Sequence, residues 1–298
     1  MNNNKLITIF TPSYNRAHLL IRTYESLKKQ TDLNFIWLIV DDGSSDGTKE
    51  LVEEWIKKEN SFEIRYVYKE NGGMHTAHNK AYEIIDTELN VCIDSDDCMP
   101  PSAIEHITKF WINNKSESVA GIVALDSDLE GNIIGTMLPS DIKEATTDEL
   151  YERYGVCGDK KFIYRTDIIN SVEPYPEFLG EKLVPLGYKY SLVADKYSML
   201  LMNDVVCEVD YQSDGSSNTI YKQYLQSPRG FAVGKIVRMT RTNSVLKRWK
   251  YIVHYIAECR IAKDAEWLNN SPLKVQTILL YPLGIMLEKW IYYQNKRV

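Results

Sequence analysis

Three carboxylates stand together where an apolar run of the sequence ends. Asp94, Asp96 and Asp97 occupy the segment Asp94-Ser95-Asp96-Asp97, which closes the strand predicted over residues 89–94. Side chains two positions apart on an extended chain point the same way, so Asp94 and Asp96 can share one cation. Oxygen ligands with open coordination positions suit Mg²⁺ or Mn²⁺, whose usual biological load is a diphosphate. The alternative is a solvated acidic turn that caps the following helix, because carboxylates favour helix N-termini.

A second pair of carboxylates, Asp41 and Asp42, follows another apolar run. Carboxylates that cluster without a lysine nearby repel one another unless a cation lies among them, which favours the metal site over the acidic turn. The Thr11 hydroxyl and the Asp42 carboxylate are placed to contact a nucleobase and a ribose, as acidic residues after a strand often do. These residues together predict a nucleotide site beside the acidic segment.

Several other nucleotide and hydrolase chemistries are disfavoured by missing motifs. No G-x-G-x-x-G follows the first apolar run, and no G-x-x-x-x-G-K-[ST] occurs in the chain. Hydride transfer with a dinucleotide and P-loop hydrolysis therefore lose their usual sequence support. No G-x-S-x-G nucleophile elbow occurs either.

The elements that must position these side chains alternate through the first hundred residues. Apolar runs bounded by Asn, Asp or Gly predict strands, and the amphipathic stretches between them predict helices. The predicted strands cover residues 6–11, 35–41, 64–68 and 89–94, and the predicted helices cover residues 17–30, 48–59 and 76–85. Strands separated by helices predict a parallel sheet, in which ligands bind at the carboxyl ends of the strands.

Polar loops follow all four predicted strands. They read Thr11-Pro12-Ser13-Tyr14-Asn15-Arg16, Asp41-Asp42-Gly43-Ser44-Ser45-Asp46-Gly47, Asn71-Gly72-Gly73-Met74-His75 and Asp94-Ser95-Asp96-Asp97. A single Asp-Gly or Asn-Gly-Gly turn occurs for local reasons. Four polar loops at one edge of a sheet predict a binding crevice.

Regular patterns are weaker after residue 100. The sequence predicts helices over residues 104–113 and 194–202, strands over 119–125 and 205–211, and a hairpin or loop over 131–138. Residues 151–193 combine short apolar runs with prolines and glycines, which indicates an irregular region facing a substrate.

Length and composition indicate a globular protein with one large domain or two modest ones. The chain has 298 residues, of which 44% are hydrophobic and 26% are charged. Its 5 cysteines form no C-x-x-C pair, so a disulfide framework and a thiolate zinc site are both disfavoured. The N-terminal segment lacks the pattern of a secretory signal, so we expect a reducing, cytoplasmic location.

Charge is distributed unevenly along the chain. Residues 222–298 hold 14 Lys and Arg against 4 Asp and Glu, whereas residues 1–221 hold 21 against 37. The acidic part is a poor nucleic-acid binder, and the basic, aromatic tail suits an anionic surface. This tail contains apolar residues at helical spacing: Val245, Trp249, Ile252, Val253 and Ile256. They predict an amphipathic helix that either packs on the catalytic domain or lies on a membrane.

The four loops, in this order and spacing, resemble the successive signatures of family 2 glycosyltransferases of the GT-A fold. The resemblance covers roughly residues 5–215. It implies an α/β fold with a mostly parallel central sheet, helices on both faces, a Rossmann-like nucleotide-binding half and a helical C-terminal extension. It also implies an inverting transferase that takes a sugar from a nucleotide diphosphate, usually UDP, with Mn²⁺ or Mg²⁺ as cofactor.

The resemblance also implies site residues. Asp96 and Asp94 would hold the metal, with Asp97 and Asp214 as further candidate ligands. Residues of the four loops, together with Asn79 of the Ala77-x-Asn79 stretch after the third loop, would bind the nucleotide: Thr11, Pro12, Tyr14, Arg16, Asp41, Asp42, Asn71, Gly72, Asn79, Asp94 and Ser95.

An inverting displacement needs a base that deprotonates the acceptor hydroxyl. The family supplies an acidic residue about ninety positions after its D-x-D motif, and Glu181 and Asp195 lie in that window. Glu181 is preferred because it lies in a loop after an aromatic residue and a glycine, whereas Asp195 begins a helix-like run and is a candidate N-cap. Lys182 stands where the commoner family pattern has an aspartate after the glutamate.

These observations favour a glycosyltransferase with residues 1–220 as the catalytic domain and residues 221–298 as a basic helical region. We expect a nucleotide-sugar donor, a lipid-linked glycan acceptor in cell-surface polysaccharide synthesis, and peripheral attachment to the anionic inner face of the cell membrane. Nucleic acid is not an expected partner, and a homodimer remains open. The alternatives are a non-catalytic nucleotide-sugar-binding or scaffold protein, and a nucleotidyltransferase, which needs a Gly-rich phosphate loop that residues 11–16 lack.

Overall fold

The computed structural model describes residues 5–59, 61–212 and 219–296. The chain divides into two compact units. The first, called the sheet unit here, comprises residues 1–71, 77–173 and 193–212, and the second, called the helical unit, comprises residues 72–76, 174–192 and 213–298. Residues 174–192 thus join the C-terminal helices, whereas the sequence placed the domain boundary at residue 220.

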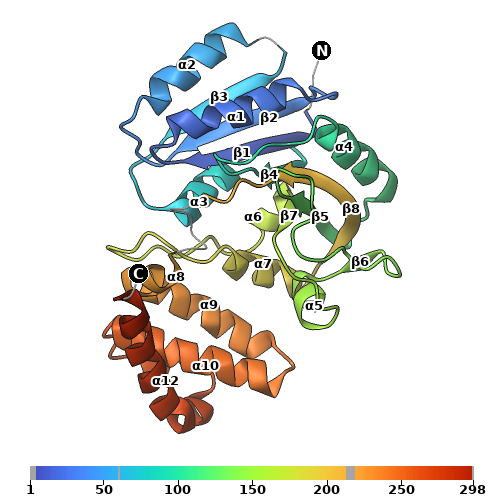
Figure 1. The fold of residues 1–298 in the computed structure, drawn as a ribbon. Coiled ribbons are helices and arrows are strands. Elements are labelled where there is room, and N and C mark those ends of the chain that lie inside the picture. Colours follow the sequence, from blue (N-terminus) through green and yellow to red (C-terminus); the bar gives the residue numbers. More distant parts are fainter. Residues whose placement is uncertain (1–4, 60, 213–218, 297–298) are drawn as a thin grey trace. The chain divides into compact units, whose positions relative to one another are not determined.

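The sheet unit is built on eight strands in the order β3-β2-β1-β4-β7-β5-β8-β6 (Figure 1). The strands are β1 (Ile7–Ser13), β2 (Phe35–Asp41), β3 (Glu63–Tyr68), β4 (Leu89–Cys92), β5 (Val119–Ser127), β6 (Glu144–Ala145), β7 (Lys160–Arg165) and β8 (Ser198–Glu208). Strands β1 to β4 pair in parallel, while β7 runs antiparallel to both β4 and β5. The predicted mostly parallel α/β sheet is confirmed.

Register brings the predicted loops to one edge of this sheet. Ile7 of β1 lies opposite Phe35 of β2, and the pairing continues until Ser13 lies opposite Asp41, so both strands end together. Strand β4 pairs with β1 as far as Cys92 opposite Phe10, and the acidic segment begins two residues later. The loops after β1, β2 and β4 therefore leave the sheet side by side.

Helices cover both faces of the sheet (Figure 1). The helices of this part are α1 (Ala17–Lys28), α2 (Thr48–Lys58), α3 (Met74–Ile84), α4 (Ala103–Asn114), α5 (Thr147–Glu152) and α6 (Thr166–Asn170). On one face α1, α2 and α4 share a core with the strands, where the Tyr24 ring stacks on Trp55 at 4.4 Å and lies 6.0 Å from Trp37. On the other face Phe10 meets His78 and Tyr82 of α3 edge-on.

One predicted helix is a strand. Helix α7 (Gly187–Ala194) ends where the predicted helix 194–202 was to begin, and β8 starts at Ser198. Strand β8 lies between β5 and β6, and its residues Met199 and Met202 are 1% and 2% exposed. A strand buried on both faces has a continuous apolar run, which periodicity cannot distinguish from a buried helix.

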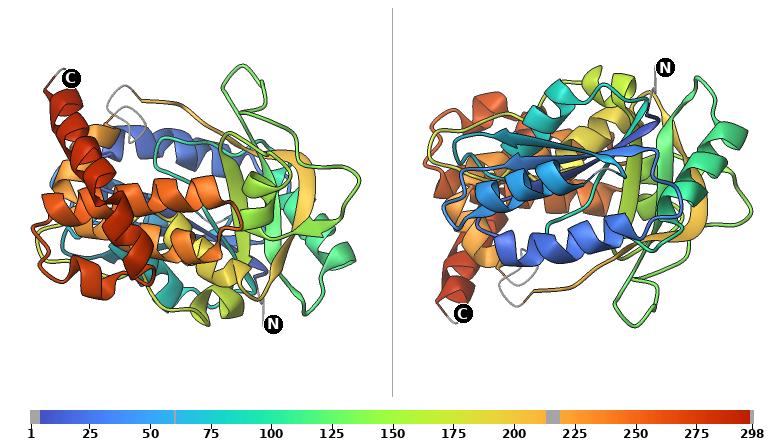
Figure 2. Two further views of the ribbon diagram at one scale, coloured as in Figure 1. Left: turned by 90° about the horizontal axis from the view of Figure 1, so that it is seen from below. Right: turned by 90° about the horizontal axis from the view of Figure 1, so that it is seen from above.

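The helical unit has its own core. Its remaining helices are α8 (Ile220–Gln226), α9 (Pro228–Arg241), α10 (Val245–Ile261), α11 (Trp267–Asn270) and α12 (Lys274–Asn295). Met239 of α9 packs with Ile252, Tyr255 and Ile256 of α10, and α12 runs across α10 (Figure 2, left). The apolar stripe predicted in the tail therefore packs inward at Ile252 and Ile256. None of the described helices is long and apolar enough to cross a membrane.

Candidate active site

The loops after β1 and β2 are joined by hydrogen bonds. The Asn15 amide donates to Ser44 Oγ at 2.9 Å, and the Ser45 amide donates to Asn15 Oδ1 at 2.8 Å. The Ala17 amide donates to Asp46 Oδ2 at 2.9 Å. Asn15 has a φ of 53°, a left-handed conformation that asparagine tolerates better than most residues. Two loops distant in sequence thus form one continuous rim.

The two aspartates that end β2 have different roles. Asp41 is 1% exposed and accepts hydrogen bonds from the Ser44 amide at 2.7 Å and from the Tyr66 hydroxyl at 2.6 Å, so it holds the turn. Asp42 pairs with Lys69 at 2.6 Å and accepts from Asn71 Nδ2 at 3.1 Å. These carboxylates therefore do have a lysine nearby, because Lys69 directly after β3 pairs with Asp42, so repulsion between unneutralised carboxylates does not apply to Asp42.

The end of β1 presents its side chains differently from what the sequence suggested. Thr11 is 0% exposed, and its Oγ1 accepts a hydrogen bond from Trp37 Nε1 at 3.0 Å, which corrects the expectation that this hydroxyl contacts a nucleotide. Ser13 is 3% exposed, and its Oγ has no hydrogen-bond partner among the described residues. Pro12 is half-buried, and Tyr14 is 49% exposed. Hydrogen bonding to a ligand at this edge would satisfy the Ser13 hydroxyl.

The acidic segment, residues 94–97, is held by a hydrogen-bonding side chain of α1. Thr23 Oγ1 contacts the carbonyls of Ser95 and Asp97 at 3.2 and 2.9 Å, and the Asp97 amide donates to the Asp94 carbonyl at 3.1 Å. Burial alternates along the segment, so that Asp94 and Asp96 are half-buried while Ser95 and Asp97 are buried. Strand β4 ends at Cys92 and residues 94–97 form a turn, so the extended-chain alternation predicted for Asp94 and Asp96 does not continue through them, although both are half-buried.

The charges of Asp94 and Asp96 influence each other. Burial raises the pKa of Asp96, and the neighbouring charge of Asp94 raises it further, with a smaller contribution from Asp210. The Arg16 guanidinium lowers this pKa in part. A cation between the two carboxylates would remove their mutual repulsion.

Asp97 is directed away from this pair. Its Oδ2 lies 3.6 Å from Lys161 Nζ, and the same ammonium lies 3.9 Å from Asp126 Oδ2. Burial raises the pKa of Asp97 and raises that of Asp126 to about 6, although Lys161 opposes both shifts. Lys161 lies in β7, so Asp97, like Asp42, has a lysine close to its carboxylate. Asp97 therefore takes part in a buried charge cluster with Lys161 and is not available as an open metal ligand.

The carboxylates of Asp94 and Asp96 fit a divalent ion only if a bound diphosphate and water fill the other positions of its coordination shell. Among the residues that the structure describes, no group of three or more His, Cys, Asp and Glu is arranged to hold a metal. Asp94 and Asp96 supply carboxylate oxygens, and Mg²⁺ commonly takes one or two carboxylates with the remaining positions filled by phosphate and water. Asp214, the fourth candidate, lies outside the described residues.

Within the helical unit, Glu181 lies at the start of α9. Its two carboxylate oxygens accept hydrogen bonds from the backbone amides of Arg229 at 3.2 Å and Gly230 at 2.9 Å, and the side chain is 9% exposed. The carboxylate thus caps the helix, a position that favours negative charge. Sequence reasoning gave no sign of this capping role.

The third predicted loop lies beside the Glu181 loop in the same unit. Gly73 has a φ of +94°, and a Cβ added there would lie 1.8 Å from the Lys182 carbonyl oxygen. Only glycine permits this approach, because any side chain would collide with the backbone. The Gly72-Gly73 turn and the Glu181-Lys182 turn therefore form one packed element.

The second candidate base lies at the other edge of the sheet. Asp195 occupies the turn between α7 and β8, so the prediction that it caps a following helix is wrong. Asp195 precedes the first residue of β8, whereas Cys207, near the last residue of this strand, lies opposite Asp126 of β5. Strand β8 has 11 residues, and at about 3.3 Å per residue its ends are on the order of 30 Å apart. The acidic segment and Asp195 thus lie at opposite ends of the strands.

Comparison with known proteins identifies the family. Residues 8–172, more than half of the chain, match the family described as Glycosyl transferase family 2. The chain belongs to glycosyltransferase family 2. It is 28% identical over 162 residues to the glycosyltransferase GlyG of Streptococcus pneumoniae, covering 53% of this chain and 52% of GlyG. It is 25% identical over 302 residues to the hyaluronan synthase of Pasteurella multocida, covering 95% of this chain and 29% of that protein.

Solved structures with the same fold include two glycosyltransferases. Residues 1–349 of Staphylococcus aureus TarS, in complex with UDP-GlcNAc, superpose with a TM-score of 0.61 at 16% identity, covering 92% of this chain and 79% of TarS. The mannosyltransferase PcManGT of Pyrobaculum calidifontis, in complex with GDP-Man and Mn²⁺, gives 0.57 at 14% identity, covering 95% and 87%. These similarities establish the GT-A fold. The chain spans about half or less of the length of GlyG and the hyaluronan synthase.

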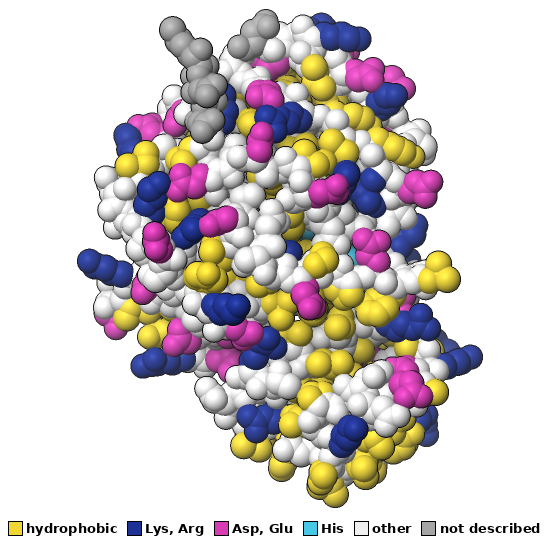
Figure 3. Space-filling view, turned by 180° about the vertical axis from the view of Figure 1, so that it is seen from behind, with side chains coloured by type: hydrophobic (Ala, Val, Ile, Leu, Met, Phe, Trp, Pro, Cys, Tyr) yellow, Lys and Arg dark blue, Asp and Glu magenta, His cyan; other side chains and the backbone are white. Residues whose placement is uncertain are grey.

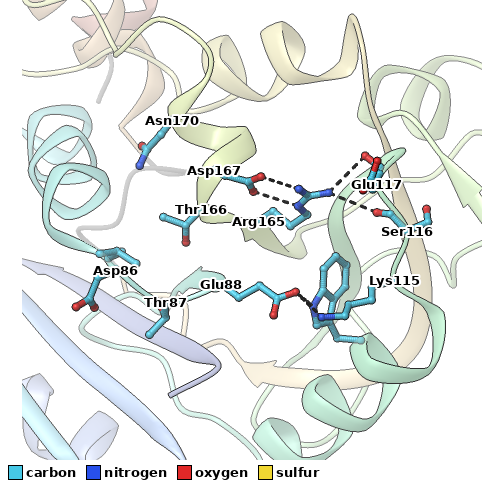
Figure 4. A pocket seen from close by; sticks show the side chains of 12 residues that line it. Asp86, Thr87, Glu88, Lys115, Ser116, Glu117, Arg165, Thr166, Asp167 and Asn170 are labelled. Carbon is cyan, nitrogen blue, oxygen red and sulfur yellow. Dashed lines mark hydrogen bonds and ion pairs between the residues drawn. The ribbon is translucent and has the colours of Figure 1, made fainter. Parts of the chain in front are cut away.

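The chain also has a cavity of about 660 Å³ at the opposite edge of its sheet. It lies where β4 begins and β7 ends, and its charged side chains face one another (Figure 4). Lys115 pairs with Glu88 at 2.8 Å, and Arg165 pairs with Asp167 at 2.6 Å. These two ion pairs neutralise four of the charged side chains that line the cavity.

Sequence reasoning missed four side chains of the candidate site. Lys69 directly follows β3 and Lys161 lies in β7, and neither segment gave a functional signal; Ser13 was read only as part of a motif. Asp210 pairs with Arg22 of α1 and lies in the field of Asp96. Its place near the carboxyl end of the predicted strand 205–211 was the one signal that pointed to it.

Proposed function

We propose that this protein transfers a sugar from a nucleoside diphosphate sugar, a UDP-sugar, to a hydroxyl group of a glycan with inversion at the anomeric carbon. The observation that carries the proposal is the pair Asp94 and Asp96, half-buried at the end of β4. Beside it, the rim formed by the β1 and β2 loops supplies hydrogen-bonding groups. Two solved structures of this fold contain UDP-GlcNAc or GDP-Man, which supports a donor of this class.

Asp94 and Asp96 are the proposed ligands of Mn²⁺ or Mg²⁺. When bound, such an ion would neutralise the negative charge that develops on the leaving diphosphate. Asp42 and Asn71 are proposed to bind the nucleoside, with their side chains held in place by Lys69 and by each other. The other proposed donor contacts come from the surrounding loops and α3: Pro12, Tyr14, Arg16, Gly72, Asn79 and Ser95.

Glu181 is the proposed base. It takes the proton of the acceptor hydroxyl as the oxygen bonds to the anomeric carbon and the bond from that carbon to the diphosphate breaks. Two backbone amides at the start of α9 hold its carboxylate in a fixed orientation. Asp195 is not proposed, because it lies at the edge of the sheet remote from Asp94.

The proposed acceptor is a lipid-linked glycan in the assembly of a surface polysaccharide such as a capsule. Curated relatives include proteins named for hyaluronan, teichuronic acid and colanic acid synthesis, which supports this class. A lipid-linked acceptor also agrees with peripheral attachment of the basic helical unit at the inner face of the membrane. We propose a hexosyl or N-acetylhexosaminyl transfer.

Turnover of a panel of nucleotide sugars tests this function. We expect one or a few UDP-sugars to release UDP with Mn²⁺ present, and we expect Asp96→Asn to abolish this release. A matched control, Asp86→Asn, removes an exposed carboxylate at the other edge of the sheet and should leave release unchanged. Nucleotide-sugar binding without release, across a full panel of donors and glycan acceptors, would instead indicate a non-catalytic binding protein.

A further inference from the structure

Helix α12 packs on α10 along one face. Thr277, Gly284 and Ile291 are buried on this face, and a Cβ added at Gly284 would lie 2.3 Å from Ile256 Cγ2. Glu288 accepts a hydrogen bond from Arg260 Nε of α10 at 2.6 Å. The orientation of α12 about its own axis is therefore fixed by a close helix contact and by an ion pair.

The opposite face of α12 is an exposed apolar stripe. Its residues recur at spacings of three and four, which places them on one side of a helix. Their exposed fractions lie between 47% and 73%: Val275, Ile278, Leu279, Leu283, Met286, Trp290 and Tyr293. From Val275 to Tyr293 the stripe is about 27 Å long at 1.5 Å per residue. Figure 3 shows hydrophobic side chains gathered on the surface of the helical unit, at the bottom of the view.

The exposed charges that α12 and its C-cap contribute beside this stripe are all positive. Lys274 and Lys289 of α12 and Lys296 directly after it are exposed. The one acidic residue of α12, Glu288, lies on the packed face and is paired with Arg260. The α12 stripe therefore combines apolar side chains with a basic border that has no carboxylate within the helix to neutralise it.

We propose that the α12 stripe lies in the headgroup region of an anionic lipid membrane. An interfacial helix buries apolar side chains at the boundary of headgroups and acyl chains, while its lysines contact anionic lipids. The rings of Trp290 and Tyr293 suit this boundary, because each has an apolar body and a polar edge. A second copy of the chain is the less suitable occupant, because two α12 helices in contact would bring lysines together without acidic partners.

This inference deepens the proposed membrane attachment and rests on that part of the proposed function, but it does not depend on the chemistry at Asp94 and Asp96. The test is sedimentation of the full chain with vesicles of phosphatidylcholine, with and without phosphatidylglycerol. We expect binding to the anionic vesicles that weakens as salt rises. The double variant Leu279→Glu/Met286→Glu should bind these vesicles at least about tenfold more weakly, because burial of even one such side chain contributes that much.

A matched control separates the α12 stripe from general apolar exposure. The double variant Ile56→Glu/Ile112→Glu places the same charges at exposed apolar positions of α2 and α4, where Ile56 and Ile112 are 42% and 60% exposed. We expect this variant to bind vesicles like the wild type. Equal binding by the stripe variant and the wild type would overturn the proposal. So would absence of vesicle binding together with a dimer that the stripe variant dissociates. Release of UDP from the donor, measured without vesicles, reports separately on catalysis.

Discussion

Replacing Lys161 with methionine probes the charge balance beneath the acidic segment. The lysine is the cation that lies within 4 Å of both Asp97 and Asp126, at 3.6 and 3.9 Å. Methionine preserves much of the side-chain volume but removes the ammonium. The buried carboxylates of Asp97 and Asp126 would then lose the positive charge beside them. Breaking a buried pair by removing one partner costs about 3–5 kcal/mol of folding free energy.

This cost depends on pH. Burial raises the pKa of Asp126 to about 6 in the folded protein, above the value of about 3.9 in an unfolded chain. The protonated carboxyl therefore favours folding below about pH 4, and this contribution is lost as the pH rises through about 6. Without Lys161 the pKa rises further, so the Lys161→Met variant should lose about 3–5 kcal/mol at pH 8. At pH 5, where Asp126 is largely protonated, we expect a loss of less than about 2 kcal/mol.

Urea unfolding of the full chain at pH 8 and pH 5 measures both values. The double variant Lys161→Met/Asp126→Asn removes a negative charge together with the positive one and should recover much of the stability at pH 8, because replacing both members of a buried pair costs far less than removing one. A loss below about 1 kcal/mol at pH 8, or an equal loss at both pH values, would contradict the assigned role of Lys161.

Three further substitutions test other parts of the structure. Asp42→Ala should weaken binding of the donor nucleotide at least about tenfold in calorimetry, because a hydrogen bond to a charged group contributes about 1.5–3 kcal/mol. Glu181→Gln should lower turnover about 10²–10⁴-fold and lower the melting temperature slightly through the weakened cap; normal turnover with a lowered melting temperature would leave Glu181 as a cap only. Gly284→Ala should destabilise the helical unit by about 1–3 kcal/mol through its collision with Ile256, whereas Gly234→Ala, with open space around it, should not.

Much of the site's location was predictable from the sequence. Four polar loops after apolar runs indicated a crevice at the carboxyl ends of parallel strands, and the register of β1 with β2 and β4 places three of them together. This inference succeeded because strand polarity and side-chain alternation are local properties of the chain. The half-buried positions of Asp94 and Asp96 arise instead in the turn that follows β4, which alternation did not predict.

The partners of these residues were not predictable in the same way. Lys161 is separated from Asp97 by sixty-four positions and reaches it because β7 is inserted antiparallel between β4 and β5. Apolar periodicity carries no information about which strands become neighbours. The capping role of Glu181 likewise depends on the start of α9, forty-eight positions later. Long-range pairing, rather than local propensity, decided these roles.

Calorimetry with UDP, in the presence and absence of Mn²⁺, tests the central claim most directly. We predict that Mn²⁺ strengthens UDP binding to the wild-type chain and that this strengthening disappears in Asp96→Ala, because the ion would link the Asp94–Asp96 pair to the diphosphate. Asp86→Ala is the matched control and should behave like the wild type. Metal-dependent affinity that is undiminished in Asp96→Ala would contradict the assignment of the acidic segment as the diphosphate site.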